Sequence, residues 1–61
     1  MKRYNYKGFY GDYGYILIHN NGTATLEMIV SGKKYRKTYK SFRGAKIALG
    51  RMSDSYTLKE V

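Results

Sequence analysis

The chain has 61 residues, and its twelve Lys and Arg against four Asp and Glu give a formal net charge of +8. Without cysteine it can form neither a disulfide framework nor a thiolate metal site, which fits a protein of the reducing cytoplasm. Hydrophobic residues make up 43% of the chain, too many for a disordered polycation, while the longest apolar runs are far too short to span a membrane. We therefore expect a single basic domain with a thin core and polyanions as natural partners.

The first segment, residues 1–13, is rich in Tyr and Gly and shows no sustained period. We expect it to form an arm outside a folded core of residues 14–58. The arm is either ordered by packing of its rings or flexible until it binds a partner, and the sequence leaves both open. Positive charge alternates with aromatic rings here, as in proteins that hold nucleic acid. The predicted arm contacts are Arg3, Tyr4, Tyr6 and Lys7.

Two strands are predicted next, over residues 13–19 and 23–30, joined by Asn20, Asn21 and Gly22. Asn-Gly is a favoured pair for a two-residue hairpin turn, because both positions require positive φ. In residues 23–30 polar and apolar side chains alternate, which indicates one buried and one wet face.

A third strand is predicted over residues 34–40, after a turn at residues 31–33. Antiparallel pairing with residues 23–30 decides which side chains share a face. The face of Leu26 and Met28 receives Tyr35, Lys37 and Tyr39. The opposite face receives Lys34, Arg36, Thr38 and Lys40.

The period changes to that of a helix after Lys40. Ser41 is an N-cap candidate. One helical stripe is formed by Phe42, Ala45, Ala48, Leu49 and Met52. The helix should span residues 42–52 and end near residues 53–55, and residues 56–61 form a short final strand or a tail. The predicted fold class is thus α+β: a three-stranded antiparallel sheet with one C-terminal helix packed on one face, in β-β-β-α order, and the other face open.

Catalytic and metal chemistry find little support in the sequence. His19 is the only histidine, and the four acids are scattered, so no set of converging ligands or nucleophile-activating groups is indicated. The seven glycines match neither phosphate-binding loop pattern. We expect no enzyme, no metal and no cofactor.

Positive charge is concentrated in residues 33–43, which hold six of the twelve basic residues and no acid. Lys commonly guards an edge strand, but a guard needs one or two charges rather than six. Basic residues interleaved with aromatic rings are typical of surfaces that hold a phosphate backbone and contact bases. The predicted nucleic-acid contacts are Lys33, Lys34, Arg36, Lys37, Thr38, Lys40 and Arg43.

A basic three-stranded sheet followed by a helix that opens with an aromatic residue resembles the DNA-binding domains of tyrosine integrases and of AP2-type plant factors. The resemblance covers residues 15–52 and rests on Arg36-Lys37 and on Ser41-Phe42-Arg43 with Ala45. It implies that the exposed sheet face lies in the major groove of duplex DNA. The size and charge also fit a stand-alone accessory protein of a phage or mobile element.

The leading prediction is therefore a small nucleic-acid-binding protein that binds duplex DNA through the open face of its three-stranded sheet, with DNA preferred over RNA and no membrane association. An alternative is a small phage-type modulator or inhibitor that docks on an acidic surface of a host enzyme or nucleoprotein, because Tyr and Arg are enriched at interface hot spots. A third is a basic protein that oligomerises through its open sheet faces.

Overall fold

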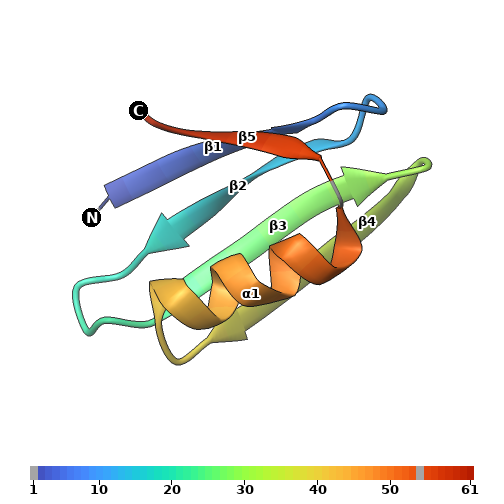
Figure 1. Ribbon diagram of the computed structural model, residues 1–61. Coiled ribbons are helices and arrows are strands. Elements are labelled where there is room, and N and C mark those ends of the chain that lie inside the picture. The colour runs from blue at the N-terminus through green and yellow to red at the C-terminus, as the bar shows by residue number, and fades with distance from the viewer. Residues whose placement is uncertain (1, 54) are drawn as a thin grey trace.

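The computed structural model describes residues 2–53 and 55–61, which form a twisted five-stranded antiparallel sheet with one helix against one face (Figure 1). The elements in chain order are β1 (Lys2–Gly8), β2 (Tyr13–Ile18), β3 (Ala24–Val30), β4 (Lys33–Tyr39), α1 (Phe42–Met52) and β5 (Tyr56–Glu60). The strand order across the sheet is β4-β3-β2-β1-β5. Four strands thus follow one another as a meander, and β5 returns after the helix to pair with β1. Met1 and Asp54 lie outside the described residues, and the helix predicted over residues 42–52 is present as α1.

The prediction of a three-stranded sheet is wrong, because strands form at both ends of the chain. Residues 2–8 are no arm: β1 pairs with β2 on one side and with β5 on the other, inside the sheet. The alternation of basic residues with Tyr4 and Tyr6 is a strand period, with the two rings on the helix side. The short final strand that was one of two alternatives for the C-terminal segment is present as β5.

Each of the two hairpin turns between the middle strands contains a glycine with positive φ, Gly22 or Gly32. At the β3–β4 turn, Val30 pairs with Lys33, and the connecting Ser31 and Gly32 have φ of 53° and 78°. Two positive φ values are typical of the type I′ turn, which matches the twist of a hairpin. At the β2–β3 turn, His19 N donates to Thr23 O at 2.8 Å, so the connection has the three predicted residues, Asn20 to Gly22, and is not the two-residue turn that the Asn-Gly pair favours.

The core lies between α1 and the sheet, and α1 packs on β2, β3 and β4. Its fully buried residues are Tyr6, Ile16, Ala24, Leu26, Met28, Ala45 and Leu49. Of the predicted core, Phe42 is only partly buried, with its ring stacked on Tyr4 at 4.7 Å between centroids. Met52 is 39% exposed, so its placement in the core is wrong.

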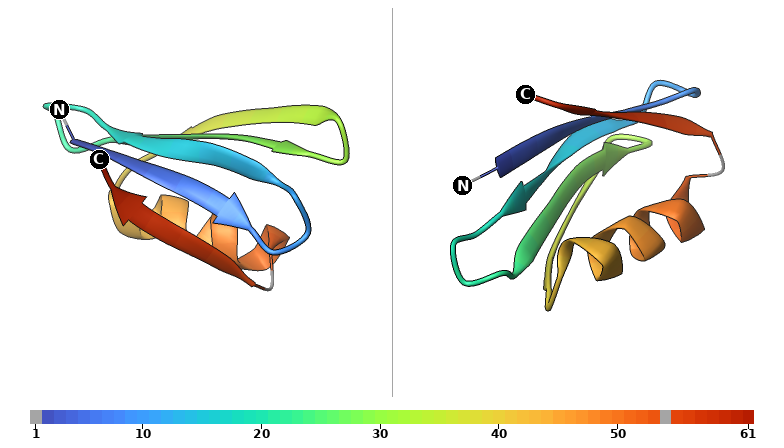
Figure 2. Two further views of the ribbon diagram at one scale, coloured as in Figure 1. Left: turned by 90° about the horizontal axis from the view of Figure 1, so that it is seen from above. Right: turned by 60° about the vertical axis from the view of Figure 1, so that its left-hand side comes forward.

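The helix begins as its sequence predicts. Ser41 Oγ accepts a hydrogen bond from Gly44 N at 3.2 Å, which satisfies one of the free donors of the first turn. The helix covers one side of the sheet only, and the opposite side is bare (Figure 2). Among the residues that the structure describes, no helix is long and apolar enough to cross a membrane.

Candidate nucleic-acid interface

The sheet face away from α1, called the open face below, is set by the strand registers. Its side chains alternate with those of the core and come from all five strands. They are Arg3, Asn5, Lys7, Tyr13, Tyr15, Leu17, Thr25, Glu27, Ile29, Lys34, Arg36, Thr38, Thr57 and Lys59. The cross-strand pairs align one row over the whole sheet: Arg36, Glu27, Tyr15, Asn5 and Lys59.

Within this set of described residues, five side chains are cationic and Glu27 is the one carboxylate. Glu27 accepts a hydrogen bond from the Tyr15 hydroxyl at 2.6 Å and forms an ion pair with Lys34 at 3.0 Å. The Tyr15 hydrogen bond and then Lys34 lower the pKa of the Glu27 carboxyl. Tyr15 and Lys34 therefore compensate the negative charge of Glu27, and the electrostatic potential of the open face stays positive.

Two tyrosines of β2 lie at the centre of the open face. Tyr15 has the Arg3 guanidinium 4.4 Å from its ring centroid, and Arg3 Nε donates to Asn5 Oδ1 at 3.1 Å. The hydrogen bond to Glu27 raises the pKa of Tyr15, so its phenol is neutral at physiological pH. Tyr13 is 55% exposed, so its ring is accessible to a ligand.

A shallow hollow opens between these two tyrosines and is lined by Arg3, Glu27 and Ile29 as well. Side chains two residues apart on a strand point the same way and lie about 6.7 Å from each other along it. That separation is about twice the 3.4 Å spacing of stacked bases. The spacing along the strand is thus comparable with base stacking, and the accessible ring is that of Tyr13, because the Arg3 guanidinium already lies over the Tyr15 ring.

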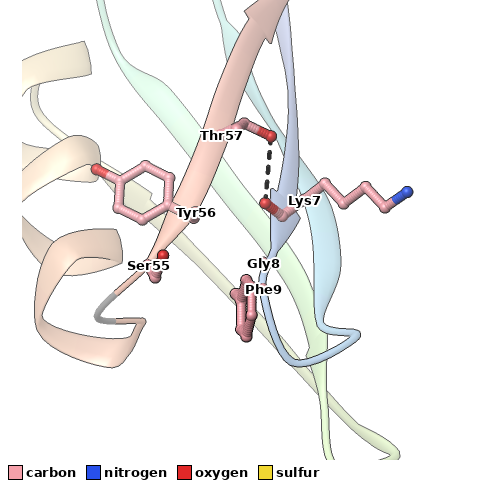
Figure 3. Close-up of a pocket in the computed structure, with 6 residues that line it drawn as sticks. All are labelled: Lys7, Gly8, Phe9, Ser55, Tyr56 and Thr57. Carbon is pink, nitrogen blue, oxygen red and sulfur yellow. Dashed lines mark hydrogen bonds between the residues drawn. The ribbon is translucent and has the colours of Figure 1, made fainter.

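A second hollow lies where β1 ends and β5 begins (Figure 3). Phe9 N donates to Ser55 O at 3.0 Å, and Thr57 Oγ1 donates to Lys7 O at 3.4 Å. The Lys7 side chain extends away from the Tyr56 ring, which points to the opposite side of the strand (Figure 3). Phe9 is 75% exposed, so it adds aromatic surface beyond Lys7 at this end of the sheet.

The residues predicted to contact nucleic acid do not all lie on the same side of the sheet. On the open face lie Lys34, Arg36 and Thr38 of the basic segment, with Arg3 and Lys7 of the supposed arm. On the helix side lie Lys33 and Lys37, which pair with Val30 and Leu26, and the core tyrosines Tyr4 and Tyr6. Lys40 follows the end of β4, and Arg43 belongs to α1. Tyr6 is 2% exposed and is unavailable to a ligand.

Among the open-face residues that sequence reasoning missed, three aromatic or cationic side chains belong to the candidate site: Tyr13, Tyr15 and Lys59. In β2 both alternating sets are apolar or aromatic, so the period alone does not say which set faces the core. Lys59 joins the face only because β5 pairs with β1. The signal that could have found it is the alternation of Tyr56 and Leu58 with polar residues.

His19 joins a chain of hydroxyl groups at one end of the open face. Its Nε2 lies 2.7 Å from Thr25 Oγ1, which lies 3.0 Å from Thr38 Oγ1. Thr25 is only 4% exposed, so this chain satisfies a buried hydroxyl and fixes the Thr38 side chain. Over residues 2–53 and 55–61, no three metal-ligating side chains of His, Asp or Glu come together.

Comparisons of the chain with protein-family models, with curated proteins and with solved structures find no match. The resemblance to integrase and AP2-type domains therefore stays a prediction. The class of protein that the geometry defines is a small antiparallel-sheet domain with a bare, cationic and partly aromatic face.

Proposed function

We propose that the protein binds single-stranded nucleic acid across its open face. The observation that carries the proposal is the exposed Tyr13 ring beside the hollow it shares with Tyr15, on a face whose only described carboxylate is already paired. Bases would stack on the Tyr13 ring, and the cations would contact phosphates. The function is binding without a catalytic step.

The width of the sheet favours a single strand over a duplex groove. Five strands at a spacing of about 4.8 Å span about 19 Å, whereas the major groove is about 12 Å wide. This difference in width favours a single strand over the groove insertion predicted for a three-stranded sheet. A single strand lies on a broad surface without such a limit.

The cations are placed to follow a phosphate backbone on both sides of the tyrosines. Arg36 and Lys34 lie on β4, and Lys7 and Lys59 lie on β1 and β5. The proposal covers DNA and RNA, with DNA expected first as in the sequence analysis. The cytoplasmic location and the phage origin stay predictions.

The test is fluorescence anisotropy with a labelled oligonucleotide of about twelve nucleotides, a length within the site sizes of small single-strand-binding domains. For the wild-type protein, log K should fall linearly with log salt by roughly 0.7 for each phosphate contact. A duplex of equal length should bind more weakly at the same salt concentration. Titration with a ribo-oligonucleotide of the same sequence compares the affinity for RNA with that for DNA.

Three variants separate stacking from charge. Tyr13→Ala should cost about 1 to 3 kcal/mol of binding free energy and leave the salt slope unchanged, because it removes a stacking ring. Lys7→Ala should weaken binding and flatten the slope. Lys46→Ala on α1 is the matched control, since it removes the same charge from the other side of the sheet. Equal losses for Lys7→Ala and Lys46→Ala, with none for Tyr13→Ala, would mean that only net charge matters and would overturn the proposal.

A further inference from the structure

Among the strands that the structure describes, none lies beside the outer edge of β4, because β4 is the last strand on its side of the sheet. It is seven residues long and pairs with β3 in one continuous register, without bulge or proline. Such an edge presents a row of backbone donors and acceptors that can template another strand.

A groove runs along this edge between β4 and α1. It is lined by Tyr35, Lys37 and Tyr39 from the strand and by Ile47, Arg51 and Met52 from the helix. Ile47 is 51% exposed and Met52 39%, so apolar surface lies open directly beside the unpaired edge.

The charge of β4 disfavours pairing with a second copy. Antiparallel pairing of two β4 strands over their full length would place Arg36 directly opposite its copy, and Lys34 and Lys37 diagonal to cations of the other chain. Like charges across strands are destabilising, whereas opposite charges stabilise the pair. The strand that complements this edge is therefore acidic.

We propose that β4 accepts an extended acidic segment of another protein as an added strand. The alternation of β4 fixes the pattern of that segment. Those residues of the added segment that face the helix side would be apolar and would pack on Ile47 and Met52. Those on the other side would be Asp or Glu beside Lys34 and Arg36. The backbone edge of β4 and the groove beside α1 are not part of the open face, so the inference does not depend on the proposed function, but the acidic side chains would share Lys34 and Arg36 with that face.

A guarded edge is the competing explanation, since Lys residues discourage strand addition. Guarding accounts for the cations of β4 but not for the exposed apolar groove next to them. The two explanations differ in what a patterned acidic peptide does.

The probe is a capped peptide of about eight residues that alternates Glu and Val, long enough to pair with the whole of β4. The reference peptide has the same composition with all Val residues before all Glu residues. Each is titrated at physiological salt into the ¹⁵N-labelled protein. The alternating peptide should shift the β4 amides and slow their hydrogen exchange, and it should bind about tenfold more tightly than the block peptide.

The decisive variant is Ile47→Lys, which changes an exposed residue and adds a positive charge. Strand addition predicts weaker binding of the alternating peptide by about tenfold, because the apolar contact is lost. Purely electrostatic attraction predicts tighter binding. Lys7→Ala, at the far side of the open face, should leave the affinity unchanged. Equal binding of both peptides, tighter binding by Ile47→Lys, or amide shifts confined to β1, β2 and β5 would overturn the proposal.

Discussion

The Tyr15 hydroxyl donates a 2.6 Å hydrogen bond to the Glu27 carboxylate, and the two residues are direct cross-strand neighbours in β2 and β3. Each perturbs the other: the pKa of Glu27 is lowered from its ordinary value of 4.5, and that of Tyr15 is raised from 10.0. The pair keeps a single carboxylate ionised at the centre of a cationic face.

Tyr15→Phe should move the pKa of Glu27 back toward its ordinary value, because the strongest interaction that lowers it is removed. A carboxyl whose pKa is lowered by folding stabilises the folded state above its unfolded pKa, and this contribution is lost as the pH falls through the folded pKa. The variant should therefore be less stable than the wild type at neutral pH, with the difference shrinking below pH 4.5. Carbon-detected NMR titration of the Glu27 carboxyl, with urea unfolding at several pH values, checks both effects. An unchanged Glu27 titration would show that Lys34 alone controls the group.

Tyr6→Phe should leave the protein equally stable or more stable by about 1 kcal/mol. Among the described residues, the Tyr6 hydroxyl is a buried polar group without a hydrogen-bond partner, and burying such a group unpaired costs free energy. The matched control is Tyr35→Phe, which removes the 2.9 Å hydrogen bond to the Tyr39 hydroxyl and should cost about 0.5 to 1.5 kcal/mol. Urea unfolding compares the two, and a clear loss for Tyr6→Phe would reveal a partner for its hydroxyl.

Stability should decline at alkaline pH because of Tyr39. Burial and the Tyr35 hydrogen bond raise the pKa of Tyr39 to about 12. The unfolded chain loses this proton near pH 10, so it binds fewer protons than the folded state between pH 10 and 12, and the free energy of unfolding falls as the pH rises through that window. Thermal unfolding of the wild type and Tyr39→Phe across this window isolates the effect, since the variant keeps every other titrating group. Parallel losses in both proteins would assign the decline to other residues.

Gly14→Ala should destabilise the sheet, whereas Gly50→Ala should not. A Cβ on Gly14 would collide with the Glu27 carbonyl oxygen and the Met28 Cα of β3, so the strands would have to move apart. A Cβ on Gly50 meets nothing within 4 Å, and Gly to Ala inside a helix stabilises by roughly 0.5 to 1 kcal/mol. Opposite shifts in melting temperature are expected, and equal shifts would contradict the close approach of β2 and β3.

The middle of the fold could be predicted from the sequence because the strand alternation of β3 and the helical period of α1 are both regular. Thr25 and Glu27 alternate with buried Leu26 and Met28, and the helical stripe around Ala45 and Leu49 covers them. Both terminal strands were harder to predict. In β1 the residues that alternate are Lys or Arg with Tyr, and a tyrosine fits a core or a ligand surface equally well.

The same ambiguity limited prediction of the candidate site. Lys34, Arg36 and Thr38 could be placed on the open face from the β3–β4 register alone. Tyr13 and Tyr15 could not, because the alternate residues of β2 are also apolar, and only packing against α1 decides between the two sets.

The pairing of β1 with β5 has a consequence for how the chain folds. β1 is synthesised well before the β5 strand that pairs with it, and the hydrogen bond from Val61 N to Arg3 O at 3.0 Å joins residues far apart in the sequence. Contacts of such long sequence separation must overcome the largest loop-closure entropy, and they slow folding relative to local structure. The meander and helix can assemble while the chain is still emerging from the ribosome. Until β5 arrives, one side of β1 remains an unpaired edge, so the nascent protein passes through a stage that is open to strand exchange.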